Sequence, residues 1–173
     1  SAFGSEDELR SMIKTFKQKG LGTIADVVIN HRKTLTNYVD FPKETYKGNT
    51  YQLLSTDICA NDCGGTTATW AQKNGYQLSS NNDTGDGVDF ARDLDHKSPN
   101  VQKNVKAYLD FLLNDLGYTG VRYDMVKGYS AGFTGMYNAD AKVQYSVGEY
   151  FDYNKQLVIN WMNGTKVNGT IQS

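Results

Sequence analysis

The chain has 173 residues, of which 39% are hydrophobic and 21% charged, and its formal net charge is -1. These values are those of an ordinary globular domain, and they exclude the clustered basic surface that a nucleic-acid-binding domain needs. Because no apolar run approaches the roughly 18 residues of a membrane helix, we also expect no membrane span.

The N-terminal segment has the pattern of a helix followed by a buried strand. Apolar residues recur at helical spacing on one face of residues 6–19, and Gly20 ends this pattern. The next run, residues 23–29, is short and rich in β-branched side chains, which is typical of a strand buried on both faces. A helix, a glycine and a buried strand in this order indicate a parallel α/β fold.

Residues 32–91 have a different composition. They are rich in Asn, Asp, Thr, Gly and Tyr, show no sustained helical period, and include a strongly turn-forming run at residues 81–87. A loop of this length is unusual in a compact domain unless it has a function of its own. We therefore predict an irregular subdomain inserted after the strand, whose Cys59 and Cys63 form a local disulfide or stay free thiols.

Regular structure is predicted to resume at Ser98, an N-cap residue, with a helix that ends before Gly117. Further strands are predicted at residues 120–126 and 144–151. Between and after them, helices are predicted over residues 130–142, broken by Gly132 and Gly135, and over residues 154–163. Strands that alternate with helices indicate parallel βαβ units.

Polar or charged side chains lie at the end of each predicted strand. Asn30 and His31 follow the first strand, Arg122 and Asp124 lie on the second, and Glu149 lies on the third. Barrel enzymes carry their catalytic groups at the carboxyl ends of parallel strands, because these ends surround one opening. We therefore expect the five side chains to face one cleft.

Two carboxylates on one cleft are what glycoside hydrolysis requires, and about 5 Å between them predicts a retaining reaction. Arg122 lies two positions before Asp124, so both side chains leave the strand on one side, and the guanidinium favours an ionised Asp124 nucleophile. Glu149 has apolar neighbours, which predicts a raised pKa that suits a general acid.

Four ordered segments, residues 25–32 (ADVVINHR), 91–96 (ARDLDH), 120–127 (GVRYDMVK) and 147–151 (VGEYF), carry a family resemblance. They are similar to conserved segments of the α-amylase family, family 13 of the glycoside hydrolases. The stretch after Asp124, Lys127-Gly128-Tyr129-Ser130, resembles plant-type and related bacterial members.

The resemblance implies the fold class: α/β, part of a TIM (β/α)8 barrel with an irregular subdomain inserted after the third barrel strand. The chain resembles an internal fragment, from the helix before the third strand to the helix after the fifth. The implied divisions are a barrel segment at 1–31, an inserted calcium-binding subdomain at 32–91, and a barrel segment at 92–173. The family's third carboxylate, a late Asp, has no counterpart after Glu149.

The resemblance also implies the chemistry: retaining endo-hydrolysis of α-1,4-glucosidic bonds in starch, glycogen and related glucans. The implied catalytic residues are Asp124, Glu149 and Arg122. The implied substrate-binding residues are His31, Lys127 and Tyr150. Many family members have His where Gly128 stands here, so a substrate contact from that side chain is not expected.

The resemblance further implies a Ca2+ site between barrel and insertion, built from oxygen donors of the kind that calcium prefers. Its implied ligands are Asn30, Asp83, Asp86, Asp93 and Gly128. Expected partners are an α-glucan and the remaining barrel segments, supplied covalently or as another chain, and a secreted or periplasmic location is expected over a cytoplasmic one.

Two other functions fit the same residues. One is a different retaining α-glucan enzyme, such as an oligosaccharide-forming amylase, a branching enzyme or an α-glucosidase. The other is a non-catalytic relative that only binds glucan or a partner protein. The presence of Arg122, Asp124 and Glu149 together argues against the second, because a pure binding protein does not need all three.

Overall fold

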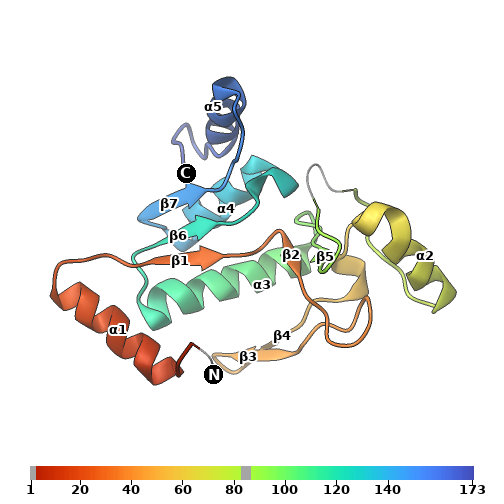
Figure 1. Ribbon diagram of the computed structural model, residues 1–173, viewed down its shortest axis with the longest axis horizontal. Coiled ribbons are helices and arrows are strands. Elements are labelled where there is room, and N and C mark those ends of the chain that lie inside the picture. Colours follow the sequence, from red (N-terminus) through yellow and green to blue (C-terminus); the bar gives the residue numbers. More distant parts are fainter. Residues whose placement is uncertain (1–2, 83–86) are drawn as a thin grey trace.

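The computed structural model describes residues 3–82 and 87–173, and a parallel three-stranded sheet lies at its centre (Figure 1). The strands are β1 (Ile24–Val27), β6 (Gly120–Tyr123) and β7 (Tyr145–Gly148), in the spatial order β1-β6-β7. Both neighbouring pairs are parallel, so the carboxyl ends of all three strands lie at one edge. The predicted α/β class is therefore confirmed.

The flanking helices begin and end where the local chemistry predicts. The first, α1 (Glu6–Gln18), precedes the sheet, and α3 (Pro99–Asp110) runs along β1, below it in the view of Figure 1. The Ser98 side chain accepts hydrogen bonds from the first free N–H groups of α3. The helix continues as a π-helical segment, Phe111–Leu116, and stops at Gly117, whose φ of 90° suits glycine.

The core lies between one face of the sheet and the helices. Val27, Val121 and Tyr123 are completely buried there, together with Val101 and Leu109 of α3. Because side chains alternate along a strand, the residues between them point to the opposite face. That opposite face carries the charged side chains from which the candidate site is built.

A continuous helix, α4 (Ala131–Ala141), corrects the prediction of a helix broken by two glycines. Gly135 is a packing position, because a Cβ added to it would lie 2.3 Å from the carbonyl oxygen of Thr165, directly after α5 (Lys155–Gly164). Glycine there lets the two helical segments approach each other. Among residues 3–82 and 87–173, no helix has the length and apolar character needed to cross a membrane.

Between β1 and α3 the chain forms small elements. Two short strands, β2 (His31–Arg32) and β5 (Arg92–Asp93), pair antiparallel at the start and end of this stretch. A hairpin of β3 (Glu44–Tyr46) and β4 (Asn49–Tyr51) and a helix, α2 (Thr66–Lys73), lie between them. The helix was not predicted, because it buries only two of its eight residues and so has little amphipathic pattern.

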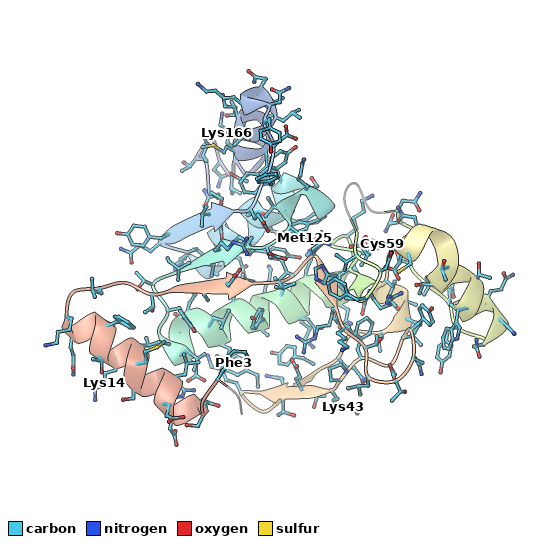
Figure 2. All side chains as sticks on the ribbon, in the orientation of Figure 1. Phe3, Lys14, Lys43, Cys59, Met125 and Lys166 are labelled. Atoms are coloured by element: carbon cyan, nitrogen blue, oxygen red, sulfur yellow. The ribbon has the colours of Figure 1, made fainter. Side chains whose placement is uncertain are left out.

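The two cysteines are free thiols, which decides between the two states that the sequence left open. Cys59 is buried, and Cys63 is half-buried within the turn Asp62–Gly65 that precedes α2. Cys59 lies in the inserted stretch, to one side of the sheet's carboxyl edge where Met125 lies (Figure 2).

Candidate active site

Arg122 joins the carboxylates at the carboxyl edge of the sheet. Its Nη1 lies 2.9 Å from Asp124 Oδ1, and its Nη2 lies 2.9 Å from Glu149 Oε2. The strand register explains this arrangement: Asp124 and Glu149 directly follow Tyr123 and Gly148, which are paired across β6 and β7. The structure thus brings the three predicted catalytic residues together on one face of the sheet.

A third carboxylate, Asp26, binds the same guanidinium and was not predicted. Its Oδ1 lies 2.7 Å from Arg122 Nη1, and the two residues are direct partners in the β1-β6 pairing. To predict this contact, one would need the register between β1 and β6, whose paired residues Asp26 and Arg122 are 96 positions apart in the sequence. Sequence patterns do not define that register, so the contact could not be found without the structure.

The backbone after Asp124 makes a further contact with the site. Met125 has a φ of 46°, a left-handed conformation that is uncommon for a residue other than glycine. In this conformation the Met125 N–H donates a hydrogen bond of 3.2 Å to Glu149 Oε2. The turn therefore ties the loop that follows Asp124 to the Glu149 carboxylate.

The predicted raised pKa of Glu149 is wrong for this structure. The hydrogen bond from the Met125 N–H, the neighbouring Asp124 carboxyl and the positive charge of Arg122 hold the pKa of Glu149 below its ordinary value. The Glu149 side chain is also 40% exposed, so the apolar neighbours in the sequence do not surround it. Ionised Glu149 is the favoured form of the site without substrate.

His31 lies on the same side of the sheet and is buried. Burial lowers the pKa of its ring, and the nearby Asp124 carboxylate opposes that shift. The ring packs edge-on against Phe90, with 5.6 Å between ring centroids, and Asn30 Nδ2 lies 3.3 Å from its Nδ1. His31 is therefore held as a largely neutral ring beside the carboxylates.

Lys127 and Tyr150 flank the loop that carries Glu149. Lys127 Nζ lies 2.9 Å from Asp152 Oδ2 and 5.1 Å from the centroid of the Tyr150 ring. The Tyr150 ring is half-buried and lies 6.1 Å from the ring of Trp161. Both predicted substrate-binding side chains thus make contacts within the protein that stabilise this loop.

The described part of the expected metal site lies where β2 meets β5. Asn30 is 1% exposed and Asp93 is 5% exposed, and the carbonyl of Asn30 accepts a 2.9 Å hydrogen bond from the N–H of Leu94. A Cβ on Gly87 would lie 3.4 Å from Asp93 Oδ2, so the chain directly after the Asp-rich turn reaches this carboxylate. An amide oxygen and a carboxylate are the hard donors that calcium takes.

The other expected ligands are placed less directly. Gly128 is buried, and the next residue, Tyr129, stacks on His96, which contacts the carbonyl of Ile29 beside Asn30. Asp83 and Asp86 lie outside the described residues. Within residues 3–82 and 87–173, no three His, Cys, Asp or Glu side chains gather as a metal-binding group.

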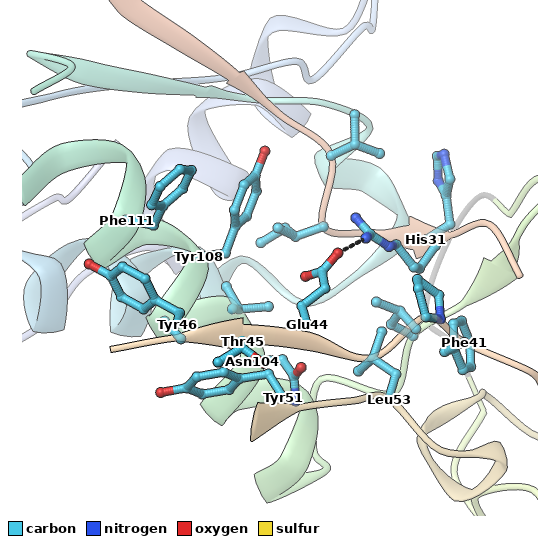
Figure 3. Close-up of a pocket in the computed structure, with 17 residues that line it drawn as sticks. His31, Phe41, Glu44, Thr45, Tyr46, Tyr51, Leu53, Asn104, Tyr108 and Phe111 are labelled. Atoms are coloured by element: carbon cyan, nitrogen blue, oxygen red, sulfur yellow. Dashed lines mark hydrogen bonds and ion pairs between the residues drawn. The ribbon is translucent and has the colours of Figure 1, made fainter. Parts of the chain in front are cut away.

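A cavity of about 380 Å³ lies between the β3-β4 hairpin and α3, and His31 is one of the residues that line it (Figure 3). Tyr46, Tyr108 and Phe111 line it, and an ion pair between Arg32 and Glu44 crosses one side. Neither Asp124 nor Glu149 lines this cavity. The catalytic chemistry is therefore assigned to the strand ends and not to the cavity.

Comparisons with known proteins show the family to which the chain belongs. Residues 1–156 match the family model described as the α-amylase catalytic domain. The chain is 30% identical over 179 residues to probable α-amylase 2 of Arabidopsis thaliana, covering 95% of the chain and 40% of that relative. It is 28% identical over 179 residues to chloroplastic α-amylase 3 of the same plant, covering 95% of the chain and 19% of that relative.

Solved structures that resemble the chain include TIM-barrel α-amylases and a cyclomaltodextrin glucanotransferase. The α-amylase of Geobacillus thermoleovorans, complexed with acarbose, superposes with a TM-score of 0.60 at 16% identity, covering 94% of this chain and 33% of that one. The predicted fold, part of a TIM (β/α)8 barrel, is therefore confirmed. The chain spans less than half the length of the relatives and the solved structure that it matches.

Proposed function

Because this chain belongs to the α-amylase family of glycoside hydrolases, we propose that its protein hydrolyses α-1,4-glucosidic bonds of starch, glycogen and related glucans with retention. The observation that carries the proposal is the pair of carboxylates, Asp124 and Glu149, bound to the two terminal nitrogens of Arg122. Two carboxylates that bind one guanidinium lie near each other, which supports a mechanism that uses a carboxylate pair.

In this proposal Asp124 is the nucleophile. Its carboxylate attacks the anomeric carbon while protonated Glu149 donates its proton to the departing glycosidic oxygen. Glu149 then removes a proton from water, which attacks the anomeric carbon and releases Asp124. Arg122 orients both carboxylates and favours the ionised nucleophile.

The acid role of Glu149 needs a change when substrate binds, because its pKa is lowered in the free site. A glucan chain over the cleft would remove water from the exposed part of the Glu149 side chain. Desolvation disfavours the charged carboxylate and so raises its pKa. Substrate itself would then help to protonate the general acid.

Around this centre we propose His31 as a sugar-binding group, since its ring is held beside Asp124. Lys127 and Tyr150 support the Glu149 loop from the other side, and we propose that both side chains contact the sugar on the leaving-group side. These three residues lie in the segments that follow β1, β6 and β7, so a bound glucan would contact all three segments together.

We also propose a calcium ion where residues 32–91, taken as the inserted subdomain, meet the barrel segments 1–31 and 92–173. Asn30 and Asp93 would supply an amide and a carboxylate oxygen, Gly128 and Asp86 carbonyl oxygens, and Asp83 a second carboxylate. The buried Asn30 and Asp93 support the proposal. Bound there, calcium would supply structural cross-linking between insertion and barrel.

The test uses Asp124→Asn in the full-length protein, assayed on soluble starch beside the wild type. We expect turnover to fall by about 10⁴-fold, as for loss of a nucleophile, while glucan binding stays measurable. Asp115→Asn is the matched control, since Asp115 pairs with Arg10 far from the cleft. Near-normal turnover of Asp124→Asn, or a product with inverted anomeric configuration in proton NMR, would exclude this mechanism.

A further inference from the structure

The turn formed by residues 59–62 holds the backbone of Asp93 on both sides. The N–H of Cys59 donates a 3.0 Å hydrogen bond to the carbonyl of Asp93, and the N–H of Asp93 donates a 3.0 Å hydrogen bond to Asp62 Oδ1. The turn itself is closed by the N–H of Asp62, which donates to the carbonyl of Cys59 at 3.1 Å. Both peptide groups next to the Asp93 Cα are therefore fixed.

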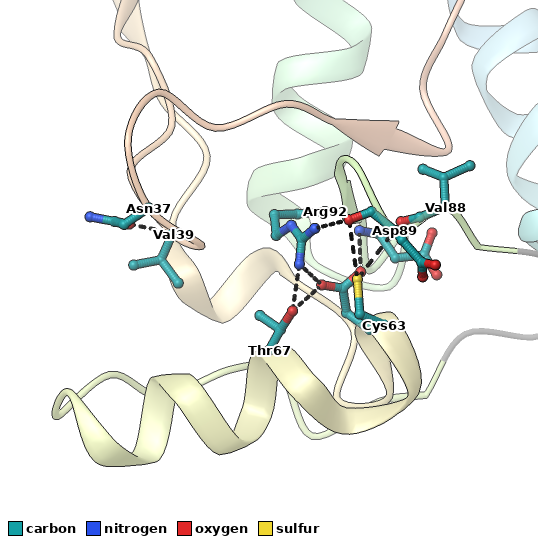
Figure 4. Close-up of polar contacts among 9 residues, drawn as sticks. Asn37, Val39, Cys63, Thr67, Val88, Asp89 and Arg92 are labelled. Atoms are coloured by element: carbon teal, nitrogen blue, oxygen red, sulfur yellow. Dashed lines mark hydrogen bonds and ion pairs between the residues drawn. The ribbon is translucent and has the colours of Figure 1, made fainter.

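The second oxygen of Asp62 is bound to a buried cation. Asp62 Oδ2 lies 2.7 Å from Arg92 Nη1, and both side chains are at most 5% exposed. The Thr67 hydroxyl donates to the same oxygen at 2.5 Å. A buried carboxylate needs such partners to stay ionised, and this pair locks Asp62 in one orientation (Figure 4).

Arg92 extends the same network to the chain that leads from the Asp-rich turn. Its Nη2 donates a 2.9 Å hydrogen bond to the carbonyl of Asp89, which also accepts a weak hydrogen bond from the Cys63 thiol at 3.7 Å. Two residues before Asp89, Gly87 approaches the Asp93 carboxylate. The ion pair therefore holds both Asp93 and the segment that faces it.

We infer that Asp62 is a positioning residue for the calcium site: its carboxylate, neutralised by Arg92, sets the position of Asp93 and thereby the affinity for calcium. The inference rests on the calcium site proposed above. Partners that orient metal ligands typically change metal affinity about 10- to 100-fold when they are mutated. The Asp62 carboxylate binds the backbone N–H of the ligand, so Asp62 acts through the position of Asp93.

The test is Asp62→Asn in the protein as it exists, with calcium affinity measured by titration calorimetry after chelator treatment. We expect the Kd for CaCl2 to rise about 10- to 100-fold, at a temperature where circular dichroism shows that the variant is folded. Thr67→Val is the milder variant for the case that Asp62→Asn does not fold. It removes one donor from Asp62 and one acceptor from Arg92, while Arg92 keeps its ion pair with Asp62. The Kd should rise in the same direction.

Asp57→Asn is the matched control. Asp57 is as buried as Asp62, but its carboxylate binds Ser98, Asn100 and the N–H of Leu54, not Asp93 or residues 87–89. The Kd of the Asp57→Asn variant for CaCl2 should equal that of the wild type. An unchanged Kd in both the Asp62 and Thr67 variants, or an equal loss in Asp57→Asn, would overturn the positioning role. A wild-type protein that binds no calcium would instead refute the calcium site itself.

Discussion

Gly148 and Trp161 are in direct contact, so that a Cβ added to Gly148 would lie 2.2 Å from Trp161 Cη2. Gly148 is the last residue of β7, and Glu149 follows it. The Trp161 ring on α5 therefore supports the backbone that presents the proposed general acid. No other residue type can take the position of Gly148 without a shift of the strand or of the indole ring.

We expect Gly148→Ala to lower the free energy of unfolding by about 1–3 kcal/mol, as overpacking does, and to lower turnover by moving Glu149. Gly132→Ala is the control, because the nearest atom to its Cβ would be Ser130 Oγ at 3.9 Å. That variant should be neutral or more stable by about 0.5–1 kcal/mol, since alanine favours helix. Urea unfolding would measure the stability of both variants, and assays on starch would measure their turnover. Equal stability of the two variants would contradict the packing argument.

Asp26 is expected to affect turnover more than stability. Its carboxylate is 67% exposed, so Asp26→Asn should change the free energy of unfolding by less than about 1 kcal/mol. The guanidinium of Arg122 would lose one of the three carboxylates that bind it. We expect kcat to fall roughly 10-fold, because Arg122 would then hold Asp124 and Glu149 less accurately in place. Glu6→Gln, which removes an exposed ion pair on α1, should leave kcat unchanged. If kcat is also unchanged in Asp26→Asn, Asp26 has no positioning role.

The pKa of Glu149 predicts a difference between two pH profiles. The alkaline limb of kcat/KM reports the acid in the free enzyme, and that of kcat reports it in the substrate complex. Because the free site lowers the pKa of Glu149 and substrate should raise it by desolvation, the kcat/KM limb should lie at lower pH than the kcat limb. Coincident limbs would show that substrate does not change the protonation of Glu149.

His96 predicts how stability depends on pH. Its ring is 3% exposed, and its Nε2 donates a 3.0 Å hydrogen bond to the carbonyl of Ile29 while Nδ1 accepts one of 2.8 Å from the Tyr137 hydroxyl. Burial lowers the pKa of His96 to about 4. The unfolded chain therefore binds a proton near pH 6.5 that the folded chain does not, so stability is lost as pH falls from about 6.5 towards 4.

His96 alone should lower the free energy of unfolding by about 2 kcal/mol between pH 7 and pH 5. His96→Gln lacks the titrating ring, so its free energy of unfolding should fall less than that of the wild type over this interval, by about that amount. Urea unfolding at the two pH values measures the difference. An identical fall in both proteins would show that His96 does not contribute to the acid sensitivity.

Features governed by local chemistry could be predicted from the sequence. Ser98 and Gly117 set the ends of the third helix, and the β-branched run before Asn30 gave a strand. The contact between Asp26 and Arg122 depends on strand register, and the lowered pKa of Glu149 depends on the left-handed backbone of Met125. No residue type in the sequence indicates either the Asp26–Arg122 contact or the lowered pKa of Glu149. Helix α2 was missed because it packs few side chains against the core.

The three carboxylates that share one guanidinium leave a formal negative charge at the carboxyl edge of the sheet. A neutral glucan gains little from this charge until positive character develops at its anomeric carbon. A sugar mimic with a basic nitrogen at that position would carry a full positive charge from the start. Cationic iminosugars should therefore inhibit this site better than uncharged analogues of the same shape, and added salt should reduce their advantage.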